Sequence, residues 1–161
     1  MQAVTVRPAV AADAEAIGAA FDAAVRPGWA YLGDVVREPL FGAEHWDQLV
    51  ADHRPPNVLL VAVDEAGSVA GYAAAHPSDG ELYQLFVDPA YGGRGVGRML
   101  LEAAHDALRA AGSSEAFLYT EERNERALAV YAAAGYRPDG QIRESDFRGQ
   151  PIRELRLFKL L

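Results

Sequence analysis

Hydrophobic residues along the chain occur both in short continuous runs and in longer segments where they recur every three or four positions. Short apolar runs bounded by proline, glycine or aspartate predict strands, and the wider spacing predicts helices. Helices are expected on this basis at 13–24, 43–53, 97–111 and 124–134. Strands are expected at 4–8, 57–63, 69–76, 81–87, 116–120, 136–143 and 152–160.

These elements follow the order β-α-α-β-β-β-α-β-α-β-β, without a linker, a repeat or a low-complexity segment. That order predicts a mixed α/β fold (an α+β mixed sheet) in which residues 1–161 form a single domain. The strand–helix–strand unit at 81–120 should place strands 81–87 and 116–120 parallel to each other. Residues 26–40 contain two prolines, two glycines and two aromatic residues, which indicates a long, partly irregular connection.

Composition excludes several classes of protein. The chain of 161 residues has no cysteine, which rules out disulfides, cysteine-ligated metals and thiol catalysis. Its 15 basic and 23 acidic residues give a net charge of −8, which argues against binding to nucleic acid. The longest strongly apolar run, 58–63, is too short to span a membrane, and the first residues lack a signal-peptide pattern. We therefore expect a cytoplasmic protein with neither a nucleic-acid nor a membrane partner.

The charge is distributed unevenly along the chain. Residues 1–90 hold four arginines and 13 acidic residues, whereas residues 91–161 hold eleven basic and ten acidic residues. An acidic half suits a cationic ligand and a nearly neutral half tolerates an anion, although acidic surfaces also keep proteins soluble.

The segment with the strongest chemical signal joins strand 81–87 to helix 97–111. It reads Gly92-Gly93-Arg94-Gly95-Val96-Gly97-Arg98, with four glycines in six residues. Glycines let successive backbone N–H groups point into one concavity, and the positive end of the helix dipole adds to the attraction for an anion. Arg94 and Arg98 can add charge-assisted hydrogen bonds, so we favour a phosphate or pyrophosphate site over a tight packing turn.

Two common phosphate-binding loops do not fit this segment. A P-loop needs Lys-Ser/Thr after its last glycine, where this chain has Arg98 and Met99. The dinucleotide fingerprint needs a glycine at the position of Leu100. A nucleotide-dependent phosphotransferase is therefore disfavoured.

The pattern instead resembles the acetyl-CoA loop of the GNAT superfamily of N-acetyltransferases, Q/R-x-x-G-x-G/A, with Gly92 in the first position. That replacement removes a side chain and leaves the backbone cradle. The preceding Leu82-Tyr83-Gln84-Leu85-Phe86-Val87-Asp88-Pro89 resembles the family's strand with its Val-x-Pro end. A second motif, Asn124-x-x-Ala127-x-x-x-Tyr131-x-x-x-Gly135-Tyr136, resembles a helix of the same family. The resemblance covers residues 81–136 closely and implies a single GNAT-like domain that uses acetyl-CoA as cosubstrate.

The resemblance implies that the two parallel strands splay apart and admit the pantetheine arm of acetyl-CoA. The backbone of Leu85, Phe86 and Val87 would pair with that arm, and an N–H near Phe86 or Val87 would hold the thioester carbonyl. Residues Gly92–Arg98 would bind the pyrophosphate. The amide of Asn124 is assigned to the cofactor as well, and a helix N-cap is its alternative role.

The same resemblance makes Tyr131 the candidate general acid beside the cofactor, with a core tyrosine as the alternative. A tyrosine of pKa near ~10 can donate a proton to a thiolate whose thiol has a pKa near ~8.5. The acceptor amine must lose a proton before it attacks. Glu81 is the candidate base, water-holding acid and substrate-binding carboxylate, but a solvated strand end fits it equally well. His76 is the second candidate base, and a structural histidine is its alternative.

The irregular connection supplies a candidate acceptor pocket, because in this family it lines the acceptor. Trp29 and Tyr31, beside glycines, suit a pocket wall. Asp34 and Glu38 nearby would favour a cationic amine through carboxylate pairing, and the aromatic rings through cation–π contacts. Packing in the core is at least as good an explanation for two further aromatic residues, Phe41 and Trp46.

His45, His53 and His105 lack metal-ligand spacing, so no metal is expected. The last hairpin is rich in charge, which predicts cross-strand pairs or a homodimer contact. Its charged residues are Arg143, Glu144, Asp146, Arg148, Arg153, Glu154 and Arg156.

These inferences converge on an acetyl-CoA-dependent N-acetyltransferase in which a bound primary amine attacks the thioester directly. The sequence does not choose between a small-molecule acceptor, cationic in our expectation, and a protein amine. A non-catalytic acyl-CoA-binding sensor or structural module on the same fold is the alternative, and turnover of any amine would separate the two.

Overall fold

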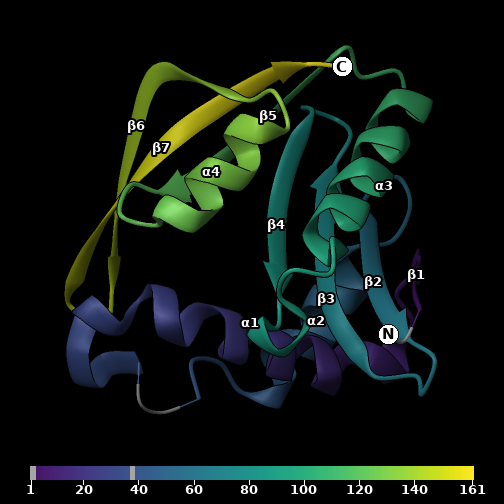
Figure 1. Ribbon diagram of the computed structural model, residues 1–161, viewed down its shortest axis with the longest axis horizontal. Coiled ribbons are helices and arrows are strands. Elements are labelled where there is room, and N and C mark those ends of the chain that lie inside the picture. Colours follow the sequence, from purple (N-terminus) through teal and green to yellow (C-terminus); the bar gives the residue numbers. More distant parts are fainter. Residues whose placement is uncertain (1–2, 37–38) are drawn as a thin grey trace.

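The computed structural model describes residues 3–36 and 39–161, which fold around a seven-stranded mixed sheet in the order β1-β2-β3-β4-β5-β7-β6 (Figure 1). The strands are β1 (Val4–Pro8), β2 (Val58–Asp64), β3 (Val69–His76), β4 (Glu81–Val87), β5 (Glu115–Glu121), β6 (Arg137–Phe147) and β7 (Gln150–Leu160). The helices are η1 (Ala11–Asp13), α1 (Ala14–Gly28), η2 (Ala30–Val36), α2 (Ala43–Asp52), η3 (Pro89–Tyr91), α3 (Val96–Ala110) and α4 (Glu125–Ala133). None of the helices in the described ranges is long and apolar enough to cross a membrane.

Helices cover both faces of the sheet. One apolar core lies between the sheet and α1, α2 and η2, and it includes Trp46 and Tyr72. The other core lies under α3 and α4 and includes Leu100. Strand β4 contributes to both, because Leu82 belongs to the α3 core while Phe86 packs against the α1 core.

The predicted mixed α/β fold is confirmed, and every predicted strand and helix is present with somewhat shifted ends. The connection 26–40, predicted as partly irregular, contains two helical segments within its described residues. Helix α1 continues to Gly28, and η2 follows as two short turns that break at Gly33, where φ is 76°. The final hairpin is longer than predicted. Its strand β6 is an almost fully exposed edge strand, and it has no alternation of apolar residues from which its length could be predicted.

Strands β4 and β5 are parallel neighbours, as predicted, but they are in register at a single position. Glu81 is opposite Phe117, and the Phe117 N–H donates to the Gly80 carbonyl at 3.0 Å. By contrast, β5 pairs with β7 along its whole length. The two parallel strands therefore diverge beyond Glu81, and the predicted splay is confirmed (Figure 1).

Two local features set the course of β4 toward this splay. The register of β3 against β4 shifts after Ala74 and leaves Tyr83 as the extra residue of a β-bulge, which bends its strand. Farther along, Gly71 lets β3 approach β4 closely, since a β-carbon there would lie 2.6 Å from the Phe86 carbonyl oxygen.

A buried hydrogen bond joins α3 to the residue that precedes β6. His105 Nε2 lies 2.7 Å from the hydroxyl of Tyr136, and His105 is only 3 % exposed. Burial, with the positive charges of Lys159 and Arg109 as lesser causes, lowers the pKa of His105 to about 4. The folded protein therefore holds this imidazole in its neutral form.

Stability should decrease as the pH is lowered through this range. His105 titrates near ~6.5 in the unfolded chain and about 4 in the folded one, so between these values the unfolded state binds more protons. We expect the free energy of unfolding to fall between pH 7 and pH 4.5, and to fall less in His105→Gln. Urea unfolding at both pH values measures this, with His45→Gln at an exposed position as the control. Equal pH slopes in the wild type and His105→Gln would contradict it.

Candidate functional site

The open edge of β4 is the first feature of the candidate site. Leu85, Phe86 and Val87 are only partly buried, although β4 lies in the middle of the sheet, because β5 has moved away from them. Backbone groups on an unpaired strand edge can accept an extended ligand as an added strand. The three residues predicted to pair with the cofactor arm lie at this edge.

The glycine segment leads from the open end of β4 into α3. The Tyr91 hydroxyl anchors it by donating to Asp64 at 2.8 Å, and this bond lowers the pKa of the Asp64 carboxyl. Gly93 and Gly95 have φ angles of 75° and 76°, a region that residues with a side chain rarely adopt. Gly95 is the N-cap of α3, and no side chain of the described residues caps it. The first N–H groups of α3 can therefore bind an anion.

Three arginines bring positive charge near this helix end. Arg94 lies over a neighbouring tyrosine ring at 5.4 Å, and Arg98 donates to Glu102 at 2.9 Å on the exposed side of α3. Arg126 of α4, which the sequence did not single out, lies close to the glycines. A β-carbon on Gly92 would be 3.1 Å from its guanidinium nitrogen. The α4 side of the splay thus adds a cation to the predicted anion site.

Asn124 caps α4, as its alternative role predicted. Its Oδ1 accepts from the Ala127 N–H at 3.1 Å. Its amide nitrogen points toward α1 and lies 3.9 Å from the place of a β-carbon on Gly28. Capping uses the oxygen and leaves the NH₂ group as a donor, so the same side chain can cap the helix and still bind a ligand.

Tyr131 is a buried residue of the core under α3 and α4. It is 7 % exposed, and its ring meets the Tyr136 ring edge-on with centroids 5.7 Å apart. Burial raises the pKa of its hydroxyl well above the usual range. The hydroxyl therefore stays protonated at ordinary pH and can act as a hydrogen-bond donor.

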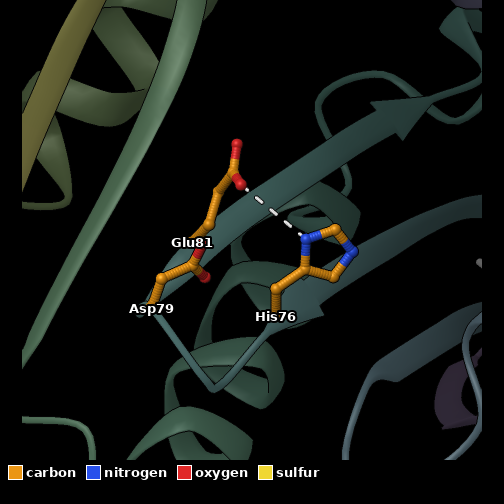
Figure 2. A group of neighbouring side chains, drawn as sticks. All are labelled: His76, Asp79 and Glu81. Carbon is orange, nitrogen blue, oxygen red and sulfur yellow. Dashed lines mark ion pairs between the residues drawn. The ribbon is translucent and has the colours of Figure 1, made fainter.

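The two candidate bases are in contact. His76 ends β3 opposite Glu81 at the start of β4, and its Nδ1 lies 3.7 Å from Glu81 Oε2 (Figure 2). On its other side, His76 Nε2 lies 3.0 Å from His53 Nε2, and His53 Nδ1 lies 2.8 Å from the Leu49 carbonyl. Burial, the largest cause, lowers the pKa of His53. His76 and Glu81, which the sequence left as alternative bases, therefore form one unit, the Glu81–His76 pair.

This unit and Tyr131 belong to opposite faces of the sheet. His53, which contacts His76, directly follows α2 and so lies on the α1 and α2 side. Tyr131 belongs to the core on the α3 and α4 side. A group bound at the β4 edge would have the carboxylate and imidazole on one face and the phenol on the other.

A pocket of about 220 Å³ lies where η2 meets the end of β5 and the final hairpin. It is lined by Tyr31, Glu121, Glu122, Arg123, Glu144, Pro151, Ile152 and Arg153. Burial, followed by the hydrogen bond to Glu121, raises the pKa of Tyr31 to about 12. The Arg123 guanidinium lies 4.8 Å above the Tyr31 ring. Three carboxylates against two guanidiniums leave this pocket with an excess of negative charge.

Of the residues predicted to bind the acceptor, Tyr31 lines this pocket and the others within the described ranges do not. The Trp29 ring instead packs on Phe147 with centroids 5.1 Å apart, and Asp34 is exposed on η2. Glu38 lies outside the described residues. The two aromatics whose alternative was the core do pack there, namely Phe41 and Trp46.

The charged run Glu121–Arg123, which lines the pocket, is not among the residues predicted from the sequence. The run begins with the last residue of the parallel strand β5. Ligands bind beyond the carboxyl ends of such strands, so its position is the signal that identifies it. The predicted cross-strand pairs are present in part, since Arg143 donates to Glu154 at 2.8 Å. Arg153 instead lies 3.4 Å from Glu122 at the pocket.

Histidine spacing predicted no metal site at His45, His53 or His105, and none of the three belongs to a potential ligand group within the described ranges. The group found there consists of His76, Asp79 and Glu81. These residues lie within six consecutive positions, and the sequence singled out two of them as candidate bases. The turn between β3 and β4 brings the three side chains together as one group.

Arg148 connects the tip of the β6–β7 hairpin to the end of η2 and to residues 39–40. Its guanidinium donates to the carbonyls of Val35, Pro39 and Leu40 at 2.8, 3.2 and 2.7 Å. Its φ is 51°, a left-handed conformation that is unusual for arginine. This link holds together the two parts of the chain that border the pocket.

Comparison with known proteins gives the chain a context. The model of the acetyltransferase (GNAT) family matches residues 24–136. A mycothiol acetyltransferase from Propionibacterium freudenreichii subsp. shermanii is 40% identical over 96 residues, covering 56% of this chain and 31% of that protein. One from Clavibacter michiganensis subsp. michiganensis is 43% identical over 108 residues, covering 66% of this chain and 31% of that protein. The chain thus spans about a third of the length of these relatives.

Solved structures share the fold along the whole chain. A phosphinothricin acetyltransferase from Sinorhizobium meliloti in complex with AcCoA superposes with a TM-score of 0.76. The match covers 98% of this chain and 88% of that one at 20% sequence identity. At 20% sequence identity, this similarity shows that the two proteins share a fold.

The Arg148 link yields a prediction for stability. Arg148→Ala should lower the free energy of unfolding by about 1.5–3 kcal/mol, because a charged donor and its three acceptors are separated. Arg148→Gly should be less damaging than Arg148→Ala, since glycine tolerates the positive φ. Calorimetric melting of both variants measures this, with Arg137→Ala on the exposed part of the same hairpin as the control. A melting temperature of Arg148→Ala equal to that of the control would refute the role of this link.

Proposed function

The chain belongs to the acetyltransferase (GNAT) family, and from this membership we propose that it transfers an acetyl group from acetyl-CoA to a primary amine. The observation that carries the proposal is the open edge of β4 with different chemistry on its two faces. The Glu81–His76 pair lies on one side and the Tyr131 hydroxyl on the other. Removing a proton from an amine and stabilising a departing thiolate require these two kinds of group.

Acetyl-CoA fits the surfaces around this edge. The uncapped N-terminus of α3 and its glycines offer N–H groups to the pyrophosphate, and Arg126 adds positive charge across the splay. The pantetheine arm would lie along Leu85–Val87 as a strand partner, with the Asn124 amide as a further donor. A backbone N–H near Phe86 or Val87 would hold the thioester carbonyl and stabilise the oxyanion that forms on attack.

The transfer would proceed by direct attack, since the chain has no cysteine that could carry an acetyl group. Glu81, or Glu81 acting through His76 or a water molecule, takes the proton of the amine as its nitrogen attacks the thioester carbon. The tetrahedral intermediate then collapses and the carbon–sulfur bond breaks. Tyr131 donates a hydrogen bond, and finally a proton, to the leaving thiolate. Burial makes this phenol a weaker acid, and the same apolar surroundings make the thiolate a stronger base.

The acceptor is proposed to be a small cationic amine that reaches the splay from the pocket beside η2. The pocket carries Glu121, Glu122 and Glu144 against two arginines, and a Tyr31 ring that can meet an ammonium. The curated relatives are mycothiol acetyltransferases, so the acceptor of those proteins belongs in any panel of amines. An anionic acceptor that turned over faster than every cationic one would refute the proposed charge preference.

Calorimetric titration with acetyl-CoA, followed by a thiol-release screen over a panel of amines, tests the function. Binding together with release of free CoA thiol in the presence of one amine class is the expected result. Binding without turnover of any amine would favour the acyl-CoA-binding sensor. Absence of binding would refute the assignment of the loop at Gly92–Arg98.

Replacing Tyr131 tests the general acid. Tyr131→Phe keeps the buried ring and removes the donor, so kcat should fall well over tenfold while the Kd for acetyl-CoA changes little. Steady-state kinetics and calorimetry measure the two quantities. Tyr119→Phe on β5 is the matched control and should keep its kcat. An unchanged kcat in Tyr131→Phe would leave this residue with a purely structural role.

Replacing Glu81 tests the base. Glu81→Gln removes the proton acceptor with little change in size, so kcat/KM should fall at least tenfold. The remaining rate should rise more steeply toward alkaline pH, because free amine in solution must then replace the lost base. A pH–rate profile from pH 6 to 10 measures this, with Glu115→Gln at the exposed start of β5 as the control. A rate and profile identical to the wild type would exclude Glu81 as the base.

A further inference from the structure

Three side chains converge at the closed end of the splay. His76, Asp79 and Glu81 each place a polar atom within 4.8 Å of the others, around a common space (Figure 2). They come from the end of β3, the connecting turn and the start of β4, so one tight turn of backbone holds all three. An imidazole nitrogen and two carboxylate oxygens form a donor set that suits zinc and similar divalent ions.

The hydrogen bonds of His53 determine which nitrogen of His76 carries a proton. His53 Nδ1 lies 2.8 Å from the Leu49 carbonyl, and a carbonyl only accepts, so Nδ1 is the donor. The other nitrogen of a neutral His53 accepts, so His76 Nε2 donates to it across 3.0 Å. His76 Nδ1 then turns a lone pair toward Glu81 Oε2, 3.7 Å away. Two acceptors that face each other repel, and a proton or a metal ion between them would turn this repulsion into an attraction.

The same contacts have the form of the support around a metal-binding histidine. Such a histidine usually donates its second N–H to a neighbouring acceptor, which fixes the tautomer and the ring orientation. His53 supplies that acceptor for His76. The Tyr83 ring stacks on the His76 ring with centroids 4.7 Å apart, and it also stacks on His53 with centroids 6.0 Å apart. His76 is therefore held with Nδ1 directed at Glu81, while a quarter of its side chain remains accessible to solvent.

An ion could be bound with small movements. Ligands at about 2.0–2.2 Å from a tetrahedral zinc ion are roughly 3.3 Å apart, close to the present separation of His76 Nδ1 and Glu81 Oε2. Asp79 is on an exposed turn and can adjust its position. The positive charge of Arg143 also acts on Glu81, but its guanidinium is paired with Glu154 at 2.8 Å. With a neutral imidazole, the three ligands carry two negative charges, which favours a divalent cation.

We propose that His76, Asp79 and Glu81 form a binding site for a divalent transition-metal ion such as zinc, with His53 as a positioning residue. The ion is not a cofactor of acetyl transfer, so the proposal goes beyond the proposed function. Where Glu81 acts as the base, the ion occupies the oxygen that must take the proton, and zinc inhibits the enzyme. The inhibition rests on the proposed function, whereas the binding does not.

The binding is tested without reference to activity. Metal-free protein is titrated with Zn²⁺ by calorimetry and with Co²⁺ by visible absorption, and one ion per chain is expected. Asp79→Asn should weaken Zn²⁺ binding at least tenfold and His76→Phe at least a hundredfold. His53→Phe should weaken it 10–100-fold, the usual effect of removing the partner of a ligating histidine. The control is Asp47→Asn, at an exposed position of α2, which should bind like the wild type.

Circular dichroism identifies any variant that does not fold. Equal affinities in the wild type, His76→Phe and Asp79→Asn would overturn the site. An effect of Asp79→Asn without an effect of His53→Phe would overturn the role of His53. In the thiol-release assay, Asp79→Asn should keep the basal rate and lose inhibition by zinc. Site-dependent binding without inhibition would support the metal site and count against Glu81 as the base.

Discussion

The candidate site depends on the loss of pairing between β4 and β5 beyond Glu81. A parallel pair in the middle of a sheet normally continues, because unpaired buried N–H and C=O groups are costly. Here β5 is held by seven positions of pairing with β7, and β4 by its bulged pairing with β3, so each strand follows its own neighbour. The divergence leaves the backbone of Leu85–Val87 without a partner on one edge. A ligand that forms hydrogen bonds with these N–H and C=O groups would therefore bind favourably.

Because the sheet has an apolar core on each face, β4 can have a different polar side chain near each of its two faces. Residues of β4 alternate between the α1 and α2 side and the α3 and α4 side, apart from the bulge at Tyr83. Glu81 is paired with His76 and lies on the α2 side of the sheet. Tyr131 is a residue of α4 and lies on the opposite side. In the proposed reaction, a group bound between them would meet an acceptor of protons on one face and a donor on the other. This separation follows from the alternation of side chains along a strand.

Much of the fold could be predicted from the sequence, because its strands and helices have distinct hydrophobic periods and clear boundaries. The glycine segment could also be recognised from the sequence, because its signal is contained in seven consecutive residues. Contacts between distant segments could not be predicted in this way. The approach of Arg126 to Gly92 depends on how α4 packs across the splay, and the contact of His53 with His76 depends on where α2 ends. The exposed edge strand β6 carries little pattern, so its length was also underestimated.

The two sides of the splay carry part of the uneven charge of the chain. The acidic first half contributes His76, Asp79 and Glu81, which face the side where a cation, as an ammonium or a metal ion, would enter. The second half contributes the arginines around the glycine segment, where their charge would favour the proposed pyrophosphate. Its acidic residues Glu121, Glu122 and Glu144 gather away from that loop, at the pocket beside η2. The near-neutral sum for this half therefore conceals two oppositely charged surfaces, and only their positions in the fold separate an anion site from a cation site.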